Sequence, residues 1–103
     1  MKRRMIFEML SVGKRNACTA RELARTLGVD PRKVSSLVEL ERRQGKPICA
    51  TCDTSGPGYF IPENREEMQW FCETLQHRAK EIQKTRAACL LTIDELPAKE
   101  AEI

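Results

Sequence analysis

Two helix-start signals separated by a glycine stand in the first half of the chain. Residues Thr19 to Glu22 form a capping box, in which the Thr19 hydroxyl accepts from the free amide of Glu22 and the Glu22 carboxylate reaches back to Thr19. Asp30 and Pro31 form the second start, because aspartate is a favoured N-cap and proline at the first helical position loses no hydrogen bond. Gly28 ends the first helix, since glycine readily adopts the left-handed conformation. The pattern predicts two short helices joined by a tight turn.

A further helix is expected ahead of this pair. Residues 3–12 place Ile6, Phe7 and Leu10 at helical spacing, and Gly13 marks the expected end. The two capped helices also carry apolar residues at helical spacing, so all three should contribute to one core. The residues expected to be buried on the capped helices are Leu23, Ala24 and Leu27 on the first and Val34, Leu37, Val38 and Leu40 on the second.

The period of the apolar residues changes to two after the capped helices. Ile48, Ala50 and Cys52 occupy alternate positions, and residues 53–58 are turn-forming residues. This pattern is typical of a β-hairpin with a loose tip, closed here at Pro62. The chain is therefore expected to be mostly α with a small β-hairpin.

A long helix is expected after the hairpin. Residues Asn64 to Glu67 give another N-terminal capping signal, and nothing breaks the helix before Thr92. The acidic residues from Asp94 onward are expected to form a flexible tail. The predicted organisation is a domain at residues 1–62, a long C-terminal helix at residues 63–92 and a flexible acidic tail at residues 93–103.

The two capped helices meet the packing requirements of a helix-turn-helix. These are a small residue on the first helix, here Ala24, a glycine in the turn, here Gly28, and branched apolar residues on the second helix, here Val34 and Leu37. On these residues the segment from Ala20 to Gln44 resembles the winged helix-turn-helix family of bacterial and phage DNA-binding proteins. The resemblance implies a winged helix, three helices plus a wing, followed by the long helix. Winged helices also serve as protein-interaction modules.

The resemblance extends over residues 3–62 and implies that the helix starting at Pro31 enters the major groove with its N-terminal half nearest the bases. Arginine pairs with guanine, serine with a base or a phosphate, and glutamate accepts from the cytosine amino group. Free amides at the start of the preceding helix favour backbone phosphates. The expected DNA-binding residues are Thr19, Arg21, Arg32, Lys33, Ser35, Ser36 and Glu39, with Lys2, Arg3, Arg4, Lys14, Arg15, Arg42, Arg43 and Lys46 as further phosphate contacts.

The charge is divided unevenly along the chain. Residues 1–62 carry 12 Lys and Arg against 6 Asp and Glu, while the rest of the chain carries 6 against 9. A basic first part suggests a polyanionic partner. Residues 47–62 nevertheless contain no basic residue. The wing can offer only backbone amides and the hydroxyls of Thr51, Thr54 and Ser55 to phosphate, so a single copy is expected to bind DNA weakly.

The long helix predicts a homodimer. Residues 64–91 as one helix would extend about 42 Å, while a compact domain of this size has a radius of gyration of about 13 Å. Met68, Leu75, Ile82 and Cys89 recur at seven-residue intervals, as in a coiled-coil seam. Polar residues interrupt the companion positions, so a helix that bends back as a hairpin is the alternative. The expected dimer interface consists of Met68, Phe71, Leu75, Ile82 and Cys89.

The cysteines do not predict a metal site. Cys49 and Cys52 have the spacing of a zinc knuckle, but a tetrahedral site needs a second ligand pair, and the chain has none. The two would also lie on opposite faces of a regular strand. Any redox role for them depends on their environment. Disulfides are not expected in the reducing cytosol.

Catalysis and membrane insertion are not expected either. The chain has one histidine, no glycine-rich phosphate loop and no Ser-His-Asp set, so no enzyme, cofactor or small-molecule ligand is predicted. The longest apolar run, Ala87 to Leu91, is too short to span a bilayer, and no secretory signal follows Met1. A cytoplasmic location is expected.

Two functions follow from these observations. The first is a small dimeric, sequence-specific protein for double-stranded DNA, either a transcriptional regulator or a phage or mobile-element accessory factor. The alternative is a winged-helix adaptor that binds another protein without DNA. The wing without basic residues and the acidic long helix favour the alternative, while the basic, hydroxyl-bearing face of the helix starting at Pro31 favours DNA.

Overall fold

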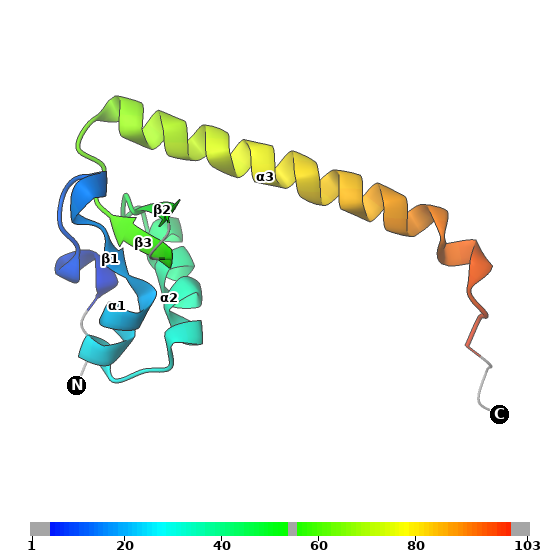
Figure 1. The fold of residues 1–103 in the computed structure, drawn as a ribbon, viewed down its shortest axis with the longest axis horizontal. Helices are drawn as coiled ribbons and strands as arrows, with labels where there is room; N and C mark the ends of the chain where they lie inside the picture. The colour runs from blue at the N-terminus through cyan, green and yellow to red at the C-terminus, as the bar shows by residue number, and fades with distance from the viewer. Residues whose placement is uncertain (1–4, 54–55, 100–103) are drawn as a thin grey trace. The chain divides into compact units, whose positions relative to one another are not determined.

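The computed structural model describes residues 5–53 and 56–99, of which residues 52, 53, 56 and 57 are described by their backbone alone. The protein is mostly helical, with a small three-stranded antiparallel sheet and a long C-terminal helix (Figure 1). In chain order the elements are the 3-10 helices η1 (Ile6–Met9) and η2 (Lys14–Asn16), strand β1 (Cys18–Thr19), helices α1 (Ala20–Leu27) and α2 (Pro31–Arg43), strands β2 (Cys49–Asp53) and β3 (Gly56–Phe60), helix α3 (Arg65–Leu91) and the 3-10 helix η3 (Ile93–Glu95).

The chain forms two compact units, Met1–Phe71 and Cys72–Ile103. The division falls inside α3 and not at the expected boundary after residue 62. The reason lies in the first turns of α3, where Phe71 is buried against Cys49 and Phe60 of the sheet. These turns therefore belong to the core of the first unit.

The helix expected at residues 3–12 is wrong in type and length over its described part. Only the single 3-10 turn η1 forms there, and Leu10 is already extended. Two contacts explain the difference. The amides that open η1 are bonded to the carboxylate of Glu41, and the backbone of Ser11 and Gly13 is bonded to Ile61 beyond β3. The segment is held by distant parts of the chain and does not continue as a helix.

The two capped helices are confirmed. The Thr19 hydroxyl accepts from the Glu22 amide at 3.1 Å, and Gly28 ends α1 in the left-handed conformation with φ of 70°. Asp30 caps α2 and Pro31 is its first residue. One half of the expected capping box differs, because the Glu22 carboxylate lies 3.5 Å from the thiol of Cys18, from which it accepts.

The predicted hairpin is confirmed as β2 and β3, and its tip at residues 54 and 55 lies outside the described residues. The sheet order is β1-β3-β2, so β1 pairs with the far edge of β3. Gly58 in β3 is paired with Thr19 on one side and Thr51 on the other. A Cβ atom at Gly58 would lie 2.9 Å from the Cβ of Ala17. Glycine fits here because the Ala17 side chain leaves no room for a Cβ atom at this position of the strand.

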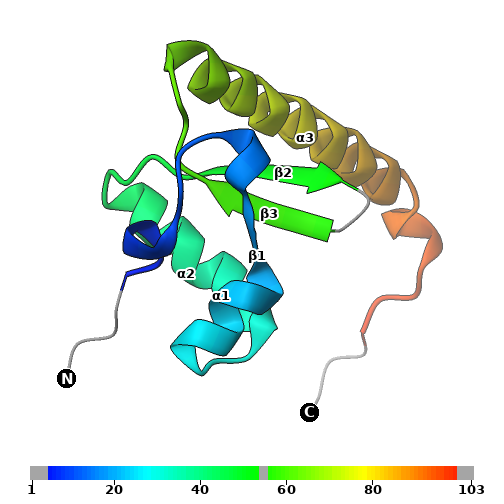
Figure 2. The same cartoon turned by 60° about the vertical axis from the view of Figure 1, so that its left-hand side comes forward.

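Side chains on the two faces of the sheet enter two apolar clusters. Tyr59 packs with the helices η1, α1 and α2, which lie against one face of the sheet (Figure 2). Phe60, the next residue, points to the other face, as the alternation of a strand requires. The main cluster consists of Ile6, Leu10, Leu23, Ala24, Val34, Val38, Ile48 and Tyr59, and the smaller one of Cys49, Phe60 and Phe71.

The expectation that Leu40 is buried is wrong. Its side chain is 52% exposed, while its neighbour Glu41 is only 1% exposed. Val34, Val38 and Glu41 follow one another at helical spacing, so they share the side of α2 that faces the core, and Leu40 lies off that side. The fold therefore places a carboxylate where the apolar pattern predicted a leucine.

Helix α3 begins and ends near the predicted residues. Asn64 accepts from the amide of Glu67 at 3.0 Å, and the helix runs for 27 residues to Leu91. Residues 93–95 add one 3-10 turn, where a flexible tail was expected. No helix in the described part of the chain combines the length and apolar character needed to span a membrane.

Candidate nucleic-acid interface

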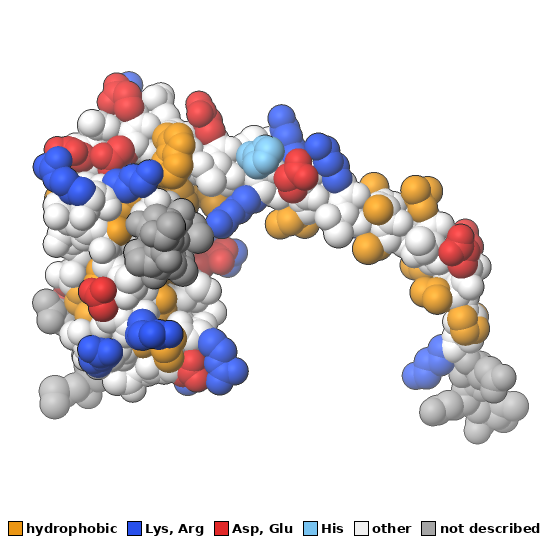
Figure 3. All heavy atoms as spheres, in the orientation of Figure 1, with side chains coloured by type: hydrophobic (Ala, Val, Ile, Leu, Met, Phe, Trp, Pro, Cys, Tyr) orange, Lys and Arg blue, Asp and Glu red, His pale blue; other side chains and the backbone are white. Residues whose placement is uncertain are grey.

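The exposed side of α2 brings together the residues predicted to contact DNA bases. Val34, Val38 and Glu41 fix the opposite side of this helix in the core. The side chains left exposed therefore lie on one surface, since positions three and four apart share a helix face. Arg32, Lys33, Ser35, Ser36 and Glu39 are all exposed. Figure 3 shows acidic and basic side chains interspersed on the visible face of this first unit.

Arg32 is paired with the residue that caps its own helix. Its Nε and Nη2 atoms donate to the two carboxylate oxygens of Asp30 at 3.2 and 2.9 Å. The Arg32 side chain is hydrogen-bonded to Asp30, and this bond lowers the pKa of Asp30 and raises the pKa of Arg32. The Arg32 side chain is 91% exposed, and an exposed ion pair contributes little to stability. Arg32 can therefore exchange this carboxylate for a phosphate or a guanine at small cost.

Glu39 is also paired on the surface. Arg43, one turn further along α2, donates to the Glu39 carboxylate at 2.8 Å. Lys33, Ser35 and Ser36 have no ion pair or side-chain hydrogen bond within residues 5–53 and 56–99. These three side chains meet solvent directly, so they are the groups of α2 that are available without breaking a contact.

The residues predicted at the start of α1 differ from one another in availability. The Thr19 side chain is half-buried, and its oxygen accepts from Glu22 as the helix cap. A hydroxyl that accepts one hydrogen bond still has its own hydrogen to donate. Arg21 is exposed. The pair can therefore present one hydroxyl and one guanidinium to a phosphate beside the N-terminus of α1.

Several of the further phosphate candidates have structural contacts. Arg42 is half-buried, donates to the Ile48 carbonyl at 2.8 Å and lies 4.7 Å from the centre of the Phe71 ring. Its contacts join α2, the start of the hairpin and α3, so Arg42 is a packing residue. Lys46 lies over the ring of Phe7. The candidates Lys2, Arg3 and Arg4 lie outside the described residues.

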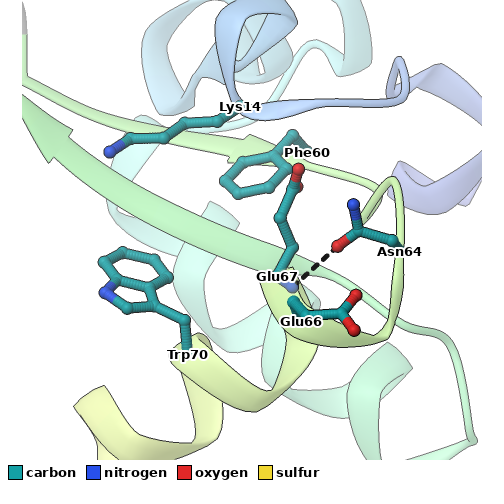
Figure 4. A pocket seen from close by; sticks show the side chains of 6 residues that line it. All are labelled: Lys14, Phe60, Asn64, Glu66, Glu67 and Trp70. Atoms are coloured by element: carbon teal, nitrogen blue, oxygen red, sulfur yellow. Dashed lines mark hydrogen bonds between the residues drawn. The ribbon is translucent and has the colours of Figure 1, made fainter.

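A shallow hollow of about 350 Å³ opens where Lys14 faces Trp70 (Figure 4). The Lys14 ammonium lies 5.3 Å from the centre of the Trp70 ring. Phe60, Asn64, Glu66 and Glu67 complete the lining of the hollow. Trp70 is 44% exposed.

Glu41 is the residue that sequence reasoning missed. Its two carboxylate oxygens accept from the amides of Ile6 and Phe7 at 2.8 Å each. One signal was present, since Glu41 falls on the same helical face as Val34 and Val38 and a charged residue on such a face needs a partner. The bonds hold the N-terminal segment against α2 and so support the helix that presents the candidate interface.

The expected dimer residues divide into two groups. Phe71 is only 5% exposed and Met68 packs against the same cluster, so both have contacts inside the chain. Leu75 is 41% and Ile82 67% exposed, and Cys89 is exposed. The free apolar stripe of α3 therefore starts at Leu75.

The cysteines offer no metal centre within the described residues, where no group of three or more His, Cys, Asp or Glu side chains is suitably placed. Cys49 is fully buried beside Phe60, and the side chain of Cys52 lies outside the description. Burial raises the pKa of Cys18, and the hydrogen bond to Glu22 and the charge of Glu22 raise it further.

Comparison with known proteins adds no relative. The sequence matches no family model, and no curated protein or solved structure is significantly similar to it. The functional argument therefore depends on the chain's own residues and their arrangement.

Proposed function

We propose that residues 6–62 form a winged helix-turn-helix domain that binds double-stranded DNA with sequence specificity through α2. The element order supports this assignment, because α1 and α2 are followed by the β2–β3 hairpin, and β1, ahead of α1, pairs with β3. The tight turn at Gly28 supports it too. The short η1 takes the place of the first helix of the motif.

The observation that carries the proposal is the two-sided character of α2. One side is fixed in the core by Val34, Val38 and Glu41, and the other presents Lys33 and Ser36 with the neighbouring hydroxyl and guanidinium groups to solvent. A helix that enters the major groove needs both properties, a rigid attachment and a free polar face.

The role of each residue follows from its contacts. Lys33 and Ser36 need no rearrangement to bind, and Arg32 exchanges Asp30 for DNA. Arg21 and the Thr19 hydroxyl fit the phosphates beside the groove. Glu39 accepts from a cytosine amino group when it leaves Arg43. Residues 47–62 contain no basic residue, so sequence-independent affinity is expected to be low and to fall as salt rises.

The test is a fluorescence-anisotropy titration of the full chain on a labelled mixed-sequence duplex at low and moderate salt, followed by a duplex selected from a random pool. We expect binding at low salt, and tighter binding to the selected duplex. The double variant Arg32→Ala, Lys33→Ala should reduce the slope of the logarithm of the binding constant against the logarithm of the salt concentration by about two. The matched control is Lys80→Ala, an exposed lysine of α3. Absence of binding at low salt, or equal losses in the double variant and the control, contradicts the proposal.

The second candidate function is a protein-binding adaptor, and the hollow beside Trp70 is the observation that favours it. An exposed tryptophan with a neighbouring cation is the kind of anchor found in protein interfaces. If the adaptor function is right, a protein partner that binds the chain should still bind the double variant Arg32→Glu, Lys33→Glu. The same partner should not bind Trp70→Ala. The reverse pattern excludes the adaptor role for the hollow.

A further inference from the structure

The second unit leaves an apolar stripe of α3 uncovered. From Cys72 to Leu91 every side chain is exposed except Thr74, which is partly buried. Leu75 and Ile82 are among the exposed apolar residues, and Figure 3 shows hydrophobic side chains recurring along this part of the helix. Helices in proteins are stabilised mainly by packing of an apolar face. The uncovered stripe of α3 is therefore a surface where a partner can add stability.

The spacing of the stripe indicates the geometry of that partner. Leu75, Ile82 and Cys89 are separated by seven residues each. A seven-residue repeat stays on one seam only when two helices coil around each other with a left-handed twist. Met68 occupies the preceding seam position but packs inside the first unit, so the seam runs from Leu75 to Cys89.

The charges beside the seam fit a second copy of the same helix. Glu81, Thr85 and Arg86 surround Ile82 on the exposed surface of α3. Glu81 comes just before the seam residue and Arg86 four positions after it. In a parallel coiled coil these two flanking positions of opposite helices lie side by side. Glu81 of each copy then meets Arg86 of the other, and by symmetry the ion pair forms twice.

We propose that a second copy of this chain covers the stripe, in a parallel and in-register two-stranded coiled coil from Leu75 to Cys89. Within one copy, Glu81 forms an exposed ion pair with Lys84 at 3.1 Å. Exposed ion pairs contribute little to stability, so Glu81 can exchange Lys84 for Arg86 of the second copy. Arg78 and Thr85 occupy the companion seam positions, so the dimer is weaker than one with apolar residues at both. The parallel register places the two Cys89 side chains opposite each other.

The first experiment measures association of the full chain by sedimentation equilibrium over a concentration series, with no DNA present. We expect a reversible dimer, and the variant Ile82→Glu should weaken association about 100-fold or more, because an apolar contact is replaced by two facing charges. The matched control is Gln83→Glu, which adds the same charge next to Ile82 in the chain but on the outer side of the helix, and should leave the dimer intact. A monomer at the highest concentration, or a dimer that Ile82→Glu does not weaken, overturns the proposal. Because DNA is absent, either result leaves the proposed DNA binding to its own test.

The second experiment tests the parallel register with diamide as the oxidant. The two Cys89 thiols lose two protons and two electrons to diamide, which becomes the hydrazine, and one S–S bond joins the chains. We expect a covalent dimer on a non-reducing gel that persists in Cys72→Ser and is lost in Cys89→Ser. A dimer in solution that gives no cross-link at Cys89 overturns the parallel register, because an antiparallel pair would separate the two Cys89 thiols.

Discussion

The carboxylate of Glu41 accepts a hydrogen bond from the backbone amide of Ile6 at 2.8 Å, although the two residues are 35 positions apart. The second oxygen accepts from Phe7 at the same distance. Glu41 therefore performs for η1 the function that an N-cap performs for a longer helix, but from another element. The same residue attaches the N-terminal segment to α2.

Replacing Glu41 should destabilise the fold more than any exposed glutamate does. Glu41→Leu leaves the buried amide of Ile6 and the partly buried amide of Phe7 without acceptors. Glu41→Gln keeps one acceptor but turns its NH2 group toward the other amide. We expect each to lower the free energy of unfolding by about 2–4 kcal/mol. Urea denaturation measures the effect, with exposed Glu73→Gln as the control. A change below about 0.5 kcal/mol, within the range of surface substitutions, would show that the two bonds contribute nothing.

Gly58→Ala should destabilise the sheet because the new Cβ would lie 2.9 Å from that of Ala17. An overpacked position of this kind costs about 1–3 kcal/mol. The structure offers a specific rescue, since Ala17→Gly removes the atom that the new methyl group meets. A double-mutant cycle on unfolding free energies checks this. The explanation fails if the two substitutions are additive.

The pair of Asp30 and Arg32 predicts a pH dependence at the start of α2. The pKa of Asp30 is lowered in the folded state from its ordinary value of 3.8 by the bond from Arg32. The charged Asp30 carboxylate therefore stabilises the fold at pH values above 3.8. This stabilisation is lost as the pH falls through the folded-state pKa. NMR titration should place the Asp30 pKa below 3.8. In Arg32→Ala it should return toward that value, and no change on this substitution would contradict the assignment.

Asp30→Asn should strengthen binding to a mixed-sequence duplex if Arg32 is a DNA contact. Asparagine keeps the N-cap oxygen but removes the charge that competes with phosphate for the guanidinium. Anisotropy at low salt measures the change. The control is Asp30→Asn in the Arg32→Ala background, where the gain should be smaller. Equal gains in both backgrounds would mean that Asp30 only repels DNA as a charge and does not restrain Arg32.

Cys18 should react more slowly with iodoacetamide than the exposed Cys72 at pH 8. Burial and Glu22 raise the Cys18 pKa, so less of its thiol is in the reactive thiolate form. Glu22→Gln removes the charge and should speed the reaction. The raised pKa means that the folded state favours the neutral Cys18 thiol. The stabilisation that this gives to the folded state is present at low pH and is lost as the pH rises through the folded-state pKa. Peptide mapping by mass spectrometry follows both cysteines, and a Cys18 that reacts as fast as Cys72 would contradict the prediction.

The sequence predicted the parts of the fold that local chemistry determines. The caps at Thr19 and Asp30, the stop at Gly28 and the start of α3 after Asn64 depend on residues close together in the chain, and all four are confirmed. The site residues of α2 were found to be exposed because they fall on the face opposite its apolar residues. Their binding of DNA stays a prediction.

The parts that the sequence did not predict depend on distant contacts. Strand β1 has two residues, too few for an alternating pattern, and exists because β3 lies beside it. The first helix was overestimated because Glu41 and Ile61 hold its backbone in other conformations. The pairing of Arg32 with Asp30 is not evident from the sequence, because residue type alone indicates an N-cap at Asp30 and a DNA contact at Arg32.

The bonds of Glu41 also set an order of events when the chain is made. Ile6 and Phe7 are added to the chain 35 and 34 residues before Glu41, and at cellular rates of synthesis the interval is on the order of seconds. Until Glu41 has been added, the amides of Ile6 and Phe7 cannot make these two bonds. The N-terminal segment therefore cannot reach its final conformation until the middle of the chain has been made.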